Sequence, residues 1–108
     1  MEYVTLKVSE LSGAALDWAV AKAWQPVYSD KHLLVHTKDF HPSTDWAQGG
    51  PIIEREELSR LICYNHNEWG CLNGDIFCDG PTPLVAAMRC YVASKLGDEV
   101  DIPLPLIG

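Results

Sequence analysis

The stretch that decides the fold is TPLVAAMRCYVASKLG, residues 82–97, which carries the start and stop signals of a helix at its two ends. Thr82 is a preferred N-cap residue, Pro83 fits the first helical position, and Gly97 provides the C-terminal stop. The apolar residues between them recur at helical spacing. They predict a buried stripe made of Val85, Met88, Val92 and Leu96, broadened by Leu84 and Tyr91.

A second helix is predicted nearer the N-terminus of the chain. Ser9 or Ser12 can cap it, and it runs to about Trp24, shortly before a proline. Its apolar residues fall on one broad arc, with Glu10 and Asp17 opposite. This pattern is typical of a helix that covers a sheet.

Alternating apolar and polar residues predict the strands, which cover residues 3–8, 32–38, 58–64, 68–72 and 75–78. Asn73-Gly74 is a tight-turn signal between the last two. Prolines 103 and 105 lack donors, so residues 102–108 are predicted to be a Pro-rich tail, either an extended strap or disordered. We expect one α+β domain over residues 1–101, with an antiparallel sheet covered by two main helices.

Residues 43–55, STDWAQGGPIIER, combine hydroxyls, carboxylates, an indole, an amide, a glycine pair and a guanidinium. Glycines let a backbone approach a ligand closely, while Trp and Arg stack on or clamp a flat, charged partner. Because Gly-Gly-Pro cannot continue a regular helix, residues 43–50 are expected to form a loop or a short interrupted helix. Asp45 is interpreted as a turn or cap residue.

Four segments together resemble the small phage proteins of the NinX type: LSGAALDWAVA (11–21), STDWAQGGPIIER (43–55), GPTPLVAAMR (80–89) and KLGDEV (95–100). The resemblance runs along the chain and weakens only in the middle. The layout of the Leu-Asp, Ser-Thr-Asp, Trp and Thr-Pro-Leu positions is also similar to the phage ABA sandwich domain, in which two helices cover one antiparallel sheet. The resemblance implies a phage context and no mechanism.

The charge balance is acidic, with a formal net charge of −7 from eight Lys and Arg against fifteen Asp and Glu. So few cations leave no extended basic footprint, and extended nucleic acid is not expected as a partner. No apolar run approaches the roughly 18 to 20 residues of a membrane helix, and no secretory signal opens the chain. We expect no membrane association and a cytoplasmic location, which for a phage protein is the host cytoplasm.

The sequence contains no nucleophile elbow, P-loop, metalloprotease or dinucleotide-binding motif. It therefore favours a non-enzymatic function without a cofactor. A hydrolase that uses Asp45, Glu54 and a histidine as acid and base is the remaining catalytic hypothesis.

The four cysteines are expected to be free thiols, because nothing in the sequence indicates secretion. Cys63-Tyr64-Asn65-His66, followed by Cys71 and Cys78, raises a zinc hypothesis, against which the irregular spacing argues. The alternative is that the cysteines are small apolar residues on strands and, for Cys90, on a helix.

Two arginines and two tryptophans favour ligand binding. Arg55 and Arg89 each offer a fork to a phosphate or carboxylate, and the first turn of the helix after Thr82 presents free N–H groups. Trp46 and Trp69 can stack on a base. The alternative is that Arg55 pairs with neighbouring glutamates and Arg89 satisfies loop carbonyls. We predict a pocket between residues 43–55 and the last helix, formed by Ser43, Thr44, Asp45, Trp46, Gln48, Gly49, Gly50, Arg55, Trp69, Thr82 and Arg89.

The leading hypothesis is a phage accessory protein that binds and sequesters a small nucleotide-type ligand. The expected ligand is a cyclic or NAD-derived nucleotide that serves as a host defence signal. The competing hypothesis is an interaction protein that docks on a host protein, with its acidic surface steering the encounter or mimicking nucleic acid. A homodimer is also expected, because Trp18 and Trp24 lie near the edge of the apolar arc and the first strand leaves an open sheet edge.

Overall fold

The computed structural model describes residues 2–24, 29–36, 38–56, 58 and 60–107. The elements follow in the order β1 (Tyr3–Lys7), η1 (Val8–Glu10), α1 (Gly13–Trp24), α2 (Asp30–His36), α3 (Trp46–Arg55), β2 (Arg60–Asn65), β3 (Glu68–Asn73), β4 (Ile76–Gly80), α4 (Pro83–Leu96), β5 (Glu99–Pro103) and η2 (Leu104–Leu106), where η marks a short 3-10 helix.

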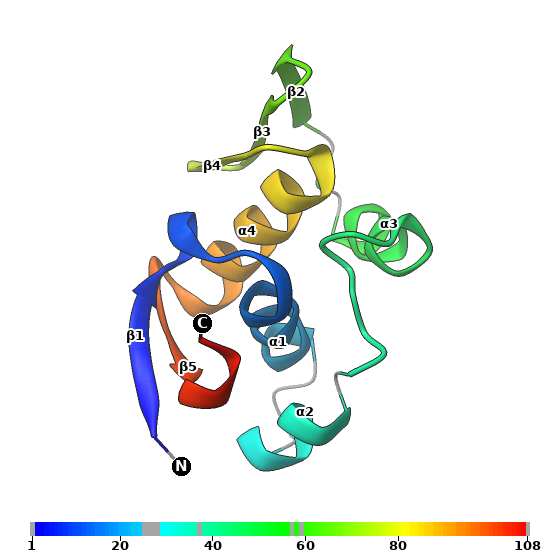
Figure 1. Cartoon of the computed structure of the whole chain (residues 1–108). Helices are drawn as coiled ribbons and strands as arrows, with labels where there is room; N and C mark the ends of the chain where they lie inside the picture. The colour runs from blue at the N-terminus through cyan, green and yellow to red at the C-terminus, as the bar shows by residue number, and fades with distance from the viewer. Residues whose placement is uncertain (1, 25–28, 37, 57, 59, 108) are drawn as a thin grey trace.

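Helix α4 lies at the centre, between the three-stranded sheet on one side and α1 on the other (Figure 1). Its ends are those that the sequence predicts: the Thr82 hydroxyl oxygen accepts a hydrogen bond from the Val85 N–H at 3.1 Å, and Gly97 ends the helix with a φ of 92°. Residues 84–88 and 90–93 are all buried, so the helix is covered on nearly every side. An apolar helix of this kind belongs inside a core rather than on a surface.

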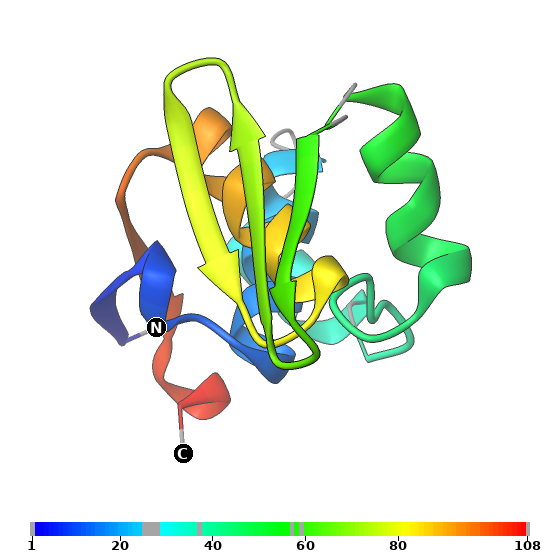
Figure 2. The same ribbon diagram turned by 90° about the horizontal axis from the view of Figure 1, so that it is seen from above.

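The strands are antiparallel and form two sheets, which confirms the α+β class. Strands β2, β3 and β4 make a meander that stands in front of α4 in Figure 2. Its register sets Ile62 opposite Gly70 and Gly70 opposite Asp79, and Gly74 forms the β3–β4 turn with a φ of 63°. Strands β1 and β5 form a separate two-stranded ribbon beside α1.

The expected strand over residues 32–38 is wrong, because the structure forms helix α2 there. Leu33 is buried and its neighbour Leu34 also packs against the core, an arrangement that a helix allows and a strand with alternating faces does not. The Ser29 hydroxyl oxygen accepts a hydrogen bond from the His32 N–H at 3.2 Å. A short apolar run with no clear period is a poor guide to helix or strand.

The expectation that Gly-Gly-Pro prevents a regular helix is also wrong, since α3 contains Pro51. Asp45 is its N-cap, as predicted, and the carboxylate accepts a hydrogen bond from the Ala47 N–H at 2.9 Å. Gly49 is buried against α4, where a Cβ atom would lie 2.7 Å from Leu84 Cδ2. Tertiary packing therefore overrides the local preference for a break.

Helix α1 follows the predicted range, but Asp17 is not on a solvated face. It is 4% exposed, whereas the helical wheel placed it opposite the apolar arc. The arc is wider than the sequence indicates because the segment before α3 covers this side of α1, where the Ser43 N–H donates to Asp17 Oδ1 at 2.9 Å. Trp18 is fully buried in the core.

The C-terminal residues continue in an ordered, extended form beyond residue 101. Ile102 and Pro103 complete β5, opposite Val4 and Tyr3 of β1, and residues 104–106 form η2. The prolines fit because the ribbon has only two strands. Within the described part of the chain, no helix combines the length and the apolar character that crossing a bilayer requires.

Candidate functional site

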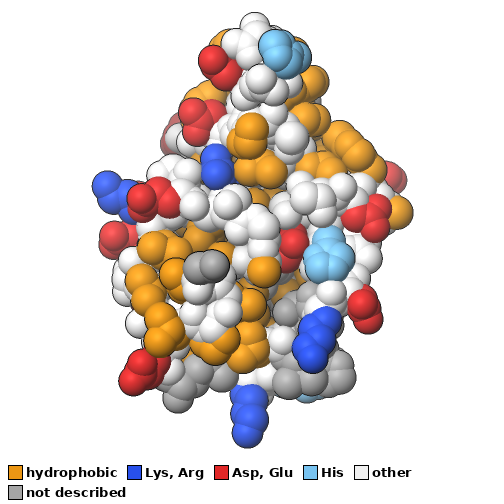
Figure 3. All heavy atoms as spheres, in the orientation of Figure 1, with side chains coloured by type: hydrophobic (Ala, Val, Ile, Leu, Met, Phe, Trp, Pro, Cys, Tyr) orange, Lys and Arg blue, Asp and Glu red, His pale blue; other side chains and the backbone are white. Residues whose placement is uncertain are grey.

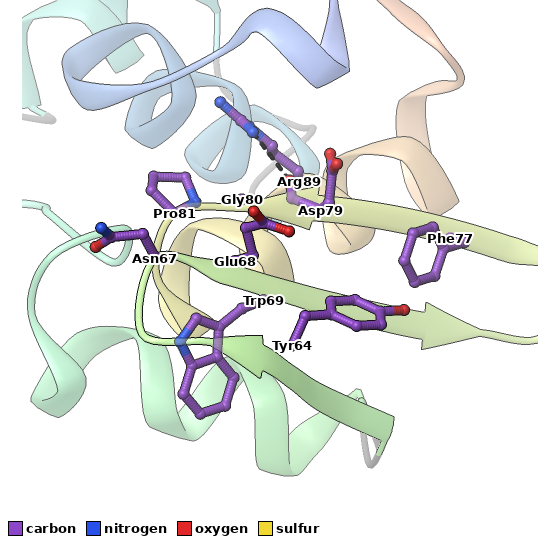
Figure 4. Close-up of a pocket in the computed structure, with 9 residues that line it drawn as sticks. All are labelled: Tyr64, Asn67, Glu68, Trp69, Phe77, Asp79, Gly80, Pro81 and Arg89. Atoms are coloured by element: carbon purple, nitrogen blue, oxygen red, sulfur yellow. Dashed lines mark hydrogen bonds between the residues drawn. The ribbon is translucent and has the colours of Figure 1, made fainter.

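A cavity of about 500 Å³ opens where β2, β3 and β4 meet the first half of α4. Figure 4 shows its lining, with Asn67 and Pro81 at one end and Phe77 towards the other. Three aromatic side chains, from three different strands, contribute to it: Tyr64, Trp69 and Phe77. The volume lies within the range of small-molecule sites.

Gly70 explains how two of these rings come together. It lies on β3 between Tyr64 and Phe77, and a Cβ atom there would lie 2.7 Å from the Phe77 ring and 3.2 Å from the Tyr64 ring. The missing side chain lets both rings fold over the strand. Tyr64 is 58% exposed and Phe77 48% exposed, so the structure leaves an aromatic platform open to solvent.

Arg89 is the cation of the cavity and is fixed by backbone oxygens. Its Nε donates to the Leu11 carbonyl at 2.8 Å and its Nη1 donates to the Asp79 carbonyl at 2.9 Å (Figure 4). The alternative interpretation, that Arg89 satisfies loop carbonyls, is therefore confirmed. A guanidinium has five N–H donors, and these two bonds use two of them.

The electrostatics of the cavity are mixed rather than basic. Burial lowers the pKa of Arg89, and the nearby Asp79 carboxylate partly offsets that effect. Glu68 and Asp79 add two carboxylates to the lining beside this single guanidinium. The two carboxylates can accept hydrogen bonds from N–H groups, and the guanidinium is the single cation among the lining residues.

Of the residues predicted to form a site, the structure brings Trp69 and Arg89 together in this cavity. Thr82 lies just beyond it and caps α4. The residues of the 43–55 segment do not line it. The structure joins that segment to α4 through Gly49, which packs against Leu84.

The polar groups of residues 43–50 mainly hold their own backbone in place. The Thr44 N–H donates to the His41 carbonyl, and Gln48 bonds both the His41 N–H and the Asp39 carbonyl. Gly50 has open space beside its Cα, and Trp46 is 54% exposed.

Ser43 is held by the buried carboxylate of α1. Its N–H donates to Asp17 Oδ1 at 2.9 Å, while Asp17 Oδ2 lies 3.5 Å from His41 Nδ1. Asp17 and His41 also line a smaller cavity of about 230 Å³ with Lys38. The Ser43 hydroxyl is buried and has no hydrogen-bond partner among the described residues. The sequence gives no sign of this contact, because Asp17 and Ser43 meet only through tertiary packing.

Arg55 does not reach the cavity. Its guanidinium lies 4.6 Å from the centre of the Trp24 ring, and the neighbouring Glu56 pairs with Lys95 at 3.0 Å. The contact between Arg55 and Trp24 joins the end of α3 to the end of α1.

The cysteine and histidine residues of the zinc hypothesis are spread over the three-stranded sheet. Cys63 is exposed and Cys71 is buried. Across residues 2–24, 29–36, 38–56, 58 and 60–107, no group of three or more His, Cys, Asp or Glu side chains is placed to hold a metal ion.

Sequence reasoning missed Tyr64, Phe77, Asn67, Glu68 and Asp79. Alternation within each strand was a usable signal, since Ile62 and Tyr64, like Phe77 and Asp79, share a face of their strand. What was missing was the register that sets these faces side by side.

A search of the curated proteins finds no match to this sequence. Residues 7–95 match the family described as Bacteriophage P22, NinX, and because this match covers most of the chain, the protein belongs to that phage family.

Proposed function

We propose that this phage protein binds a small nucleotide-type ligand in the cavity between the three-stranded sheet and α4, and holds it without chemical change. The observation that carries the proposal is the placement of two open aromatic rings, Tyr64 and Phe77, and one fixed arginine at a cavity of about 500 Å³, which Trp69 also lines. A protein of this kind sequesters its ligand, and host defence signals of the cyclic or NAD-derived type are the class that a phage gains from sequestering.

The aromatic rings support the part of the proposal that concerns the base. Stacking of a base on an aromatic side chain contributes about 1–3 kcal/mol and tolerates different bases. Tyr64 and Phe77 present an open platform, and Trp69 is partly buried against the core, which holds its ring in place. A planar heterocycle therefore finds a preformed stacking surface.

The polar groups support selectivity for bases that carry an exocyclic amino group. The carboxylates of Glu68 and Asp79 accept hydrogen bonds from such a group, and the Asn67 amide both donates and accepts. Arg89 then takes the phosphate through the donors that its two carbonyl contacts leave over.

The test is isothermal titration calorimetry of the folded protein with adenosine, guanosine, cytidine and uridine monophosphates. We expect the first three nucleotides to bind more tightly than the uridine nucleotide, which lacks the exocyclic amino group. Trp69→Ala should weaken binding about tenfold, given the usual contribution of one stacked base. Mass spectrometry of the recovered ligand should show an unchanged mass.

Trp46→Ala is the matched control, because Trp46 is an exposed tryptophan that does not line the cavity. It should leave the dissociation constant unchanged. Trp69→Phe keeps a stacking ring and should retain most of the affinity, which separates loss of stacking from loss of folding. Equal affinities for the Trp69→Ala and Trp46→Ala variants would exclude this cavity as the site.

A second candidate, docking on a host protein, is favoured by the outer face of the sheet. Ile62 is 38% exposed and lies on the same face as Tyr64 and Phe77. Figure 3 shows hydrophobic side chains gathered at this end of the molecule. Ile62 does not line the cavity, so Ile62→Lys separates the two functions. It should abolish docking on a protein and leave nucleotide binding unchanged.

A further inference from the structure

Three cysteine side chains meet between the three-stranded sheet and α4, on the face of the sheet opposite the aromatic platform. Cys71 and Cys78 are directly opposite each other on β3 and β4, and Cys90 comes from α4. We call Cys71, Cys78 and Cys90 the thiol cluster. The Cys90 sulfur lies 3.7 Å from the carbonyl oxygen of Ile76, which shares a face of β4 with Cys78, and the Cys71 and Cys78 thiols both affect the pKa of Cys90. Cys90 is therefore the central sulfur.

One member of the thiol cluster can be reached from solvent. Cys71 and Cys90 are buried, whereas Cys78 is partly exposed. Cys78 also lines a second cavity, of about 410 Å³, together with Lys7 of β1 and Asp98 before β5. A small reagent in this cavity meets Cys78 first, with Cys90 directly behind it. The placement of the two thiols, although not the pKa of Cys78, is that of an attacking thiol with a resolving thiol beside it.

We propose that Cys78 and Cys90 are a thiol-exchange site, which forms a reversible disulfide when the folded protein meets a low-molecular-weight disulfide. The Cys78 thiolate attacks one sulfur of the reagent, the reagent's sulfur–sulfur bond breaks, and one thiol leaves. The Cys90 thiolate then attacks the Cys78 sulfur and the second thiol leaves. The protein loses two electrons and two protons, and the reagent gains them as two thiols.

Cys71 takes no part in the disulfide, but its interaction with Cys90 raises the pKa of the Cys90 thiol. A hydrogen bond from Cys90 lowers the pKa of Cys71, while hydrogen bonding to Cys90 and burial raise the pKa of Cys78. Cys78 is therefore a neutral thiol at neutral pH, and only thiolates attack disulfides. The exchange rate should increase as the pH is raised into the alkaline range.

The experiment uses the Cys63→Ser variant, because Cys63 is exposed and would otherwise take up the reagent. The folded protein is treated with oxidised glutathione and its intact mass is measured without reduction. We expect a loss of two hydrogen atoms, a cross-linked peptide pair that contains Cys78 and Cys90, and full reversal by dithiothreitol. An unchanged mass, under conditions in which the same protein takes up glutathione after unfolding, would overturn the proposal.

Three further variants in the same background identify the roles. Cys90→Ala should retain glutathione on Cys78 as a stable mixed disulfide, because the resolving thiol is absent. Cys78→Ala should not react while folded, and Cys71→Ser should still form the disulfide. A disulfide in the Cys78→Ala variant would assign the bond to Cys71 and Cys90 and overturn the proposal. Since Cys71→Ser and Cys78→Ala give opposite expectations, the outcome does not depend on whether the Cys90 variant folds.

Discussion

Arg89 joins two stretches of backbone that are far apart in the sequence, through its bonds to the Leu11 and Asp79 carbonyls. Replacing it with alanine leaves both acceptors without their donor. We expect Arg89→Ala to lower the free energy of unfolding by about 1–3 kcal/mol, as measured by urea denaturation. Arg89→Lys can reach only one of the two carbonyls at a time, so its free energy of unfolding should lie between those of the wild type and Arg89→Ala. A loss below about 0.5 kcal/mol, the range of ordinary surface substitutions, would contradict this role.

Tyr91 gives the molecule a predictable response to alkaline pH. Its ring packs edge-on against Trp24, and burial, with a smaller contribution from Glu56, raises its pKa from 10.0 to about 12. The unfolded chain loses this proton at lower pH than the folded chain, so the folded state is favoured below pH 10 and loses that advantage as the pH rises towards 12. Ultraviolet absorbance of tyrosinate should show late titration, to which Tyr3 contributes beside Tyr91 because its hydrogen bond to Asp30 also raises its pKa. The decrease of the late absorbance change in Tyr91→Phe isolates the contribution of Tyr91.

Two adjacent glycines of α3 should respond to different extents to the same substitution. At Gly49 a Cβ atom would lie 2.7 Å from Leu84 Cδ2 and would also meet the Pro42 carbonyl, whereas at Gly50 nothing lies within 4 Å. We expect Gly49→Ala to destabilise the fold by about 1–3 kcal/mol through overpacking. Gly50→Ala should change the stability by less than about 1 kcal/mol, because the gain in helix propensity is opposed by the steric restriction that Pro51 places on the residue before it. The measurement is the melting temperature of each variant. Equal shifts of the two melting temperatures would mean that α3 does not pack against Leu84 as described.

The elements that could be predicted from the sequence are those whose signals are local. Thr82, Pro83 and Gly97 mark α4 within a few residues of its ends, and strand alternation marks the β2–β4 meander. Helix α2 was missed, and α3 was expected only as a loop or a short interrupted helix, because tertiary contacts decide both: Leu33 and Leu34 pack inward, and Gly49 lies against α4. The cavity was predicted only in part for a related reason, since Tyr64 and Phe77 join Trp69 through strand register.

At the scale of the whole molecule, the tryptophans no longer support self-association. Trp18 is buried, and Trp24 packs between Tyr91 and Arg55. A homodimer would instead use the edge of strand β2, which has a neighbouring strand on one side only among the described residues.

We expect light scattering at low micromolar concentration to report about twice the chain mass of 12.0 kDa. Ile62→Lys places a charge in the centre of the proposed interface and should return the protein to a monomer. Lys7→Glu, on the separate ribbon, is the charge-changing control and should leave the mass unchanged. A monomeric wild type would rule out the homodimer at that concentration.

The position of α4 along the chain determines when this protein can fold during its synthesis. The elements α1, α3, β2, β3 and β4 all pack on a helix that the ribosome makes after them, and β1 waits for β5. The pairing of Thr5 with Asp101 closes a loop of almost the entire chain, and contacts of such high sequence separation form slowly. The nascent chain therefore has no core of its own until Leu96 has left the exit tunnel. Until then its apolar segments are open to chaperones and proteases.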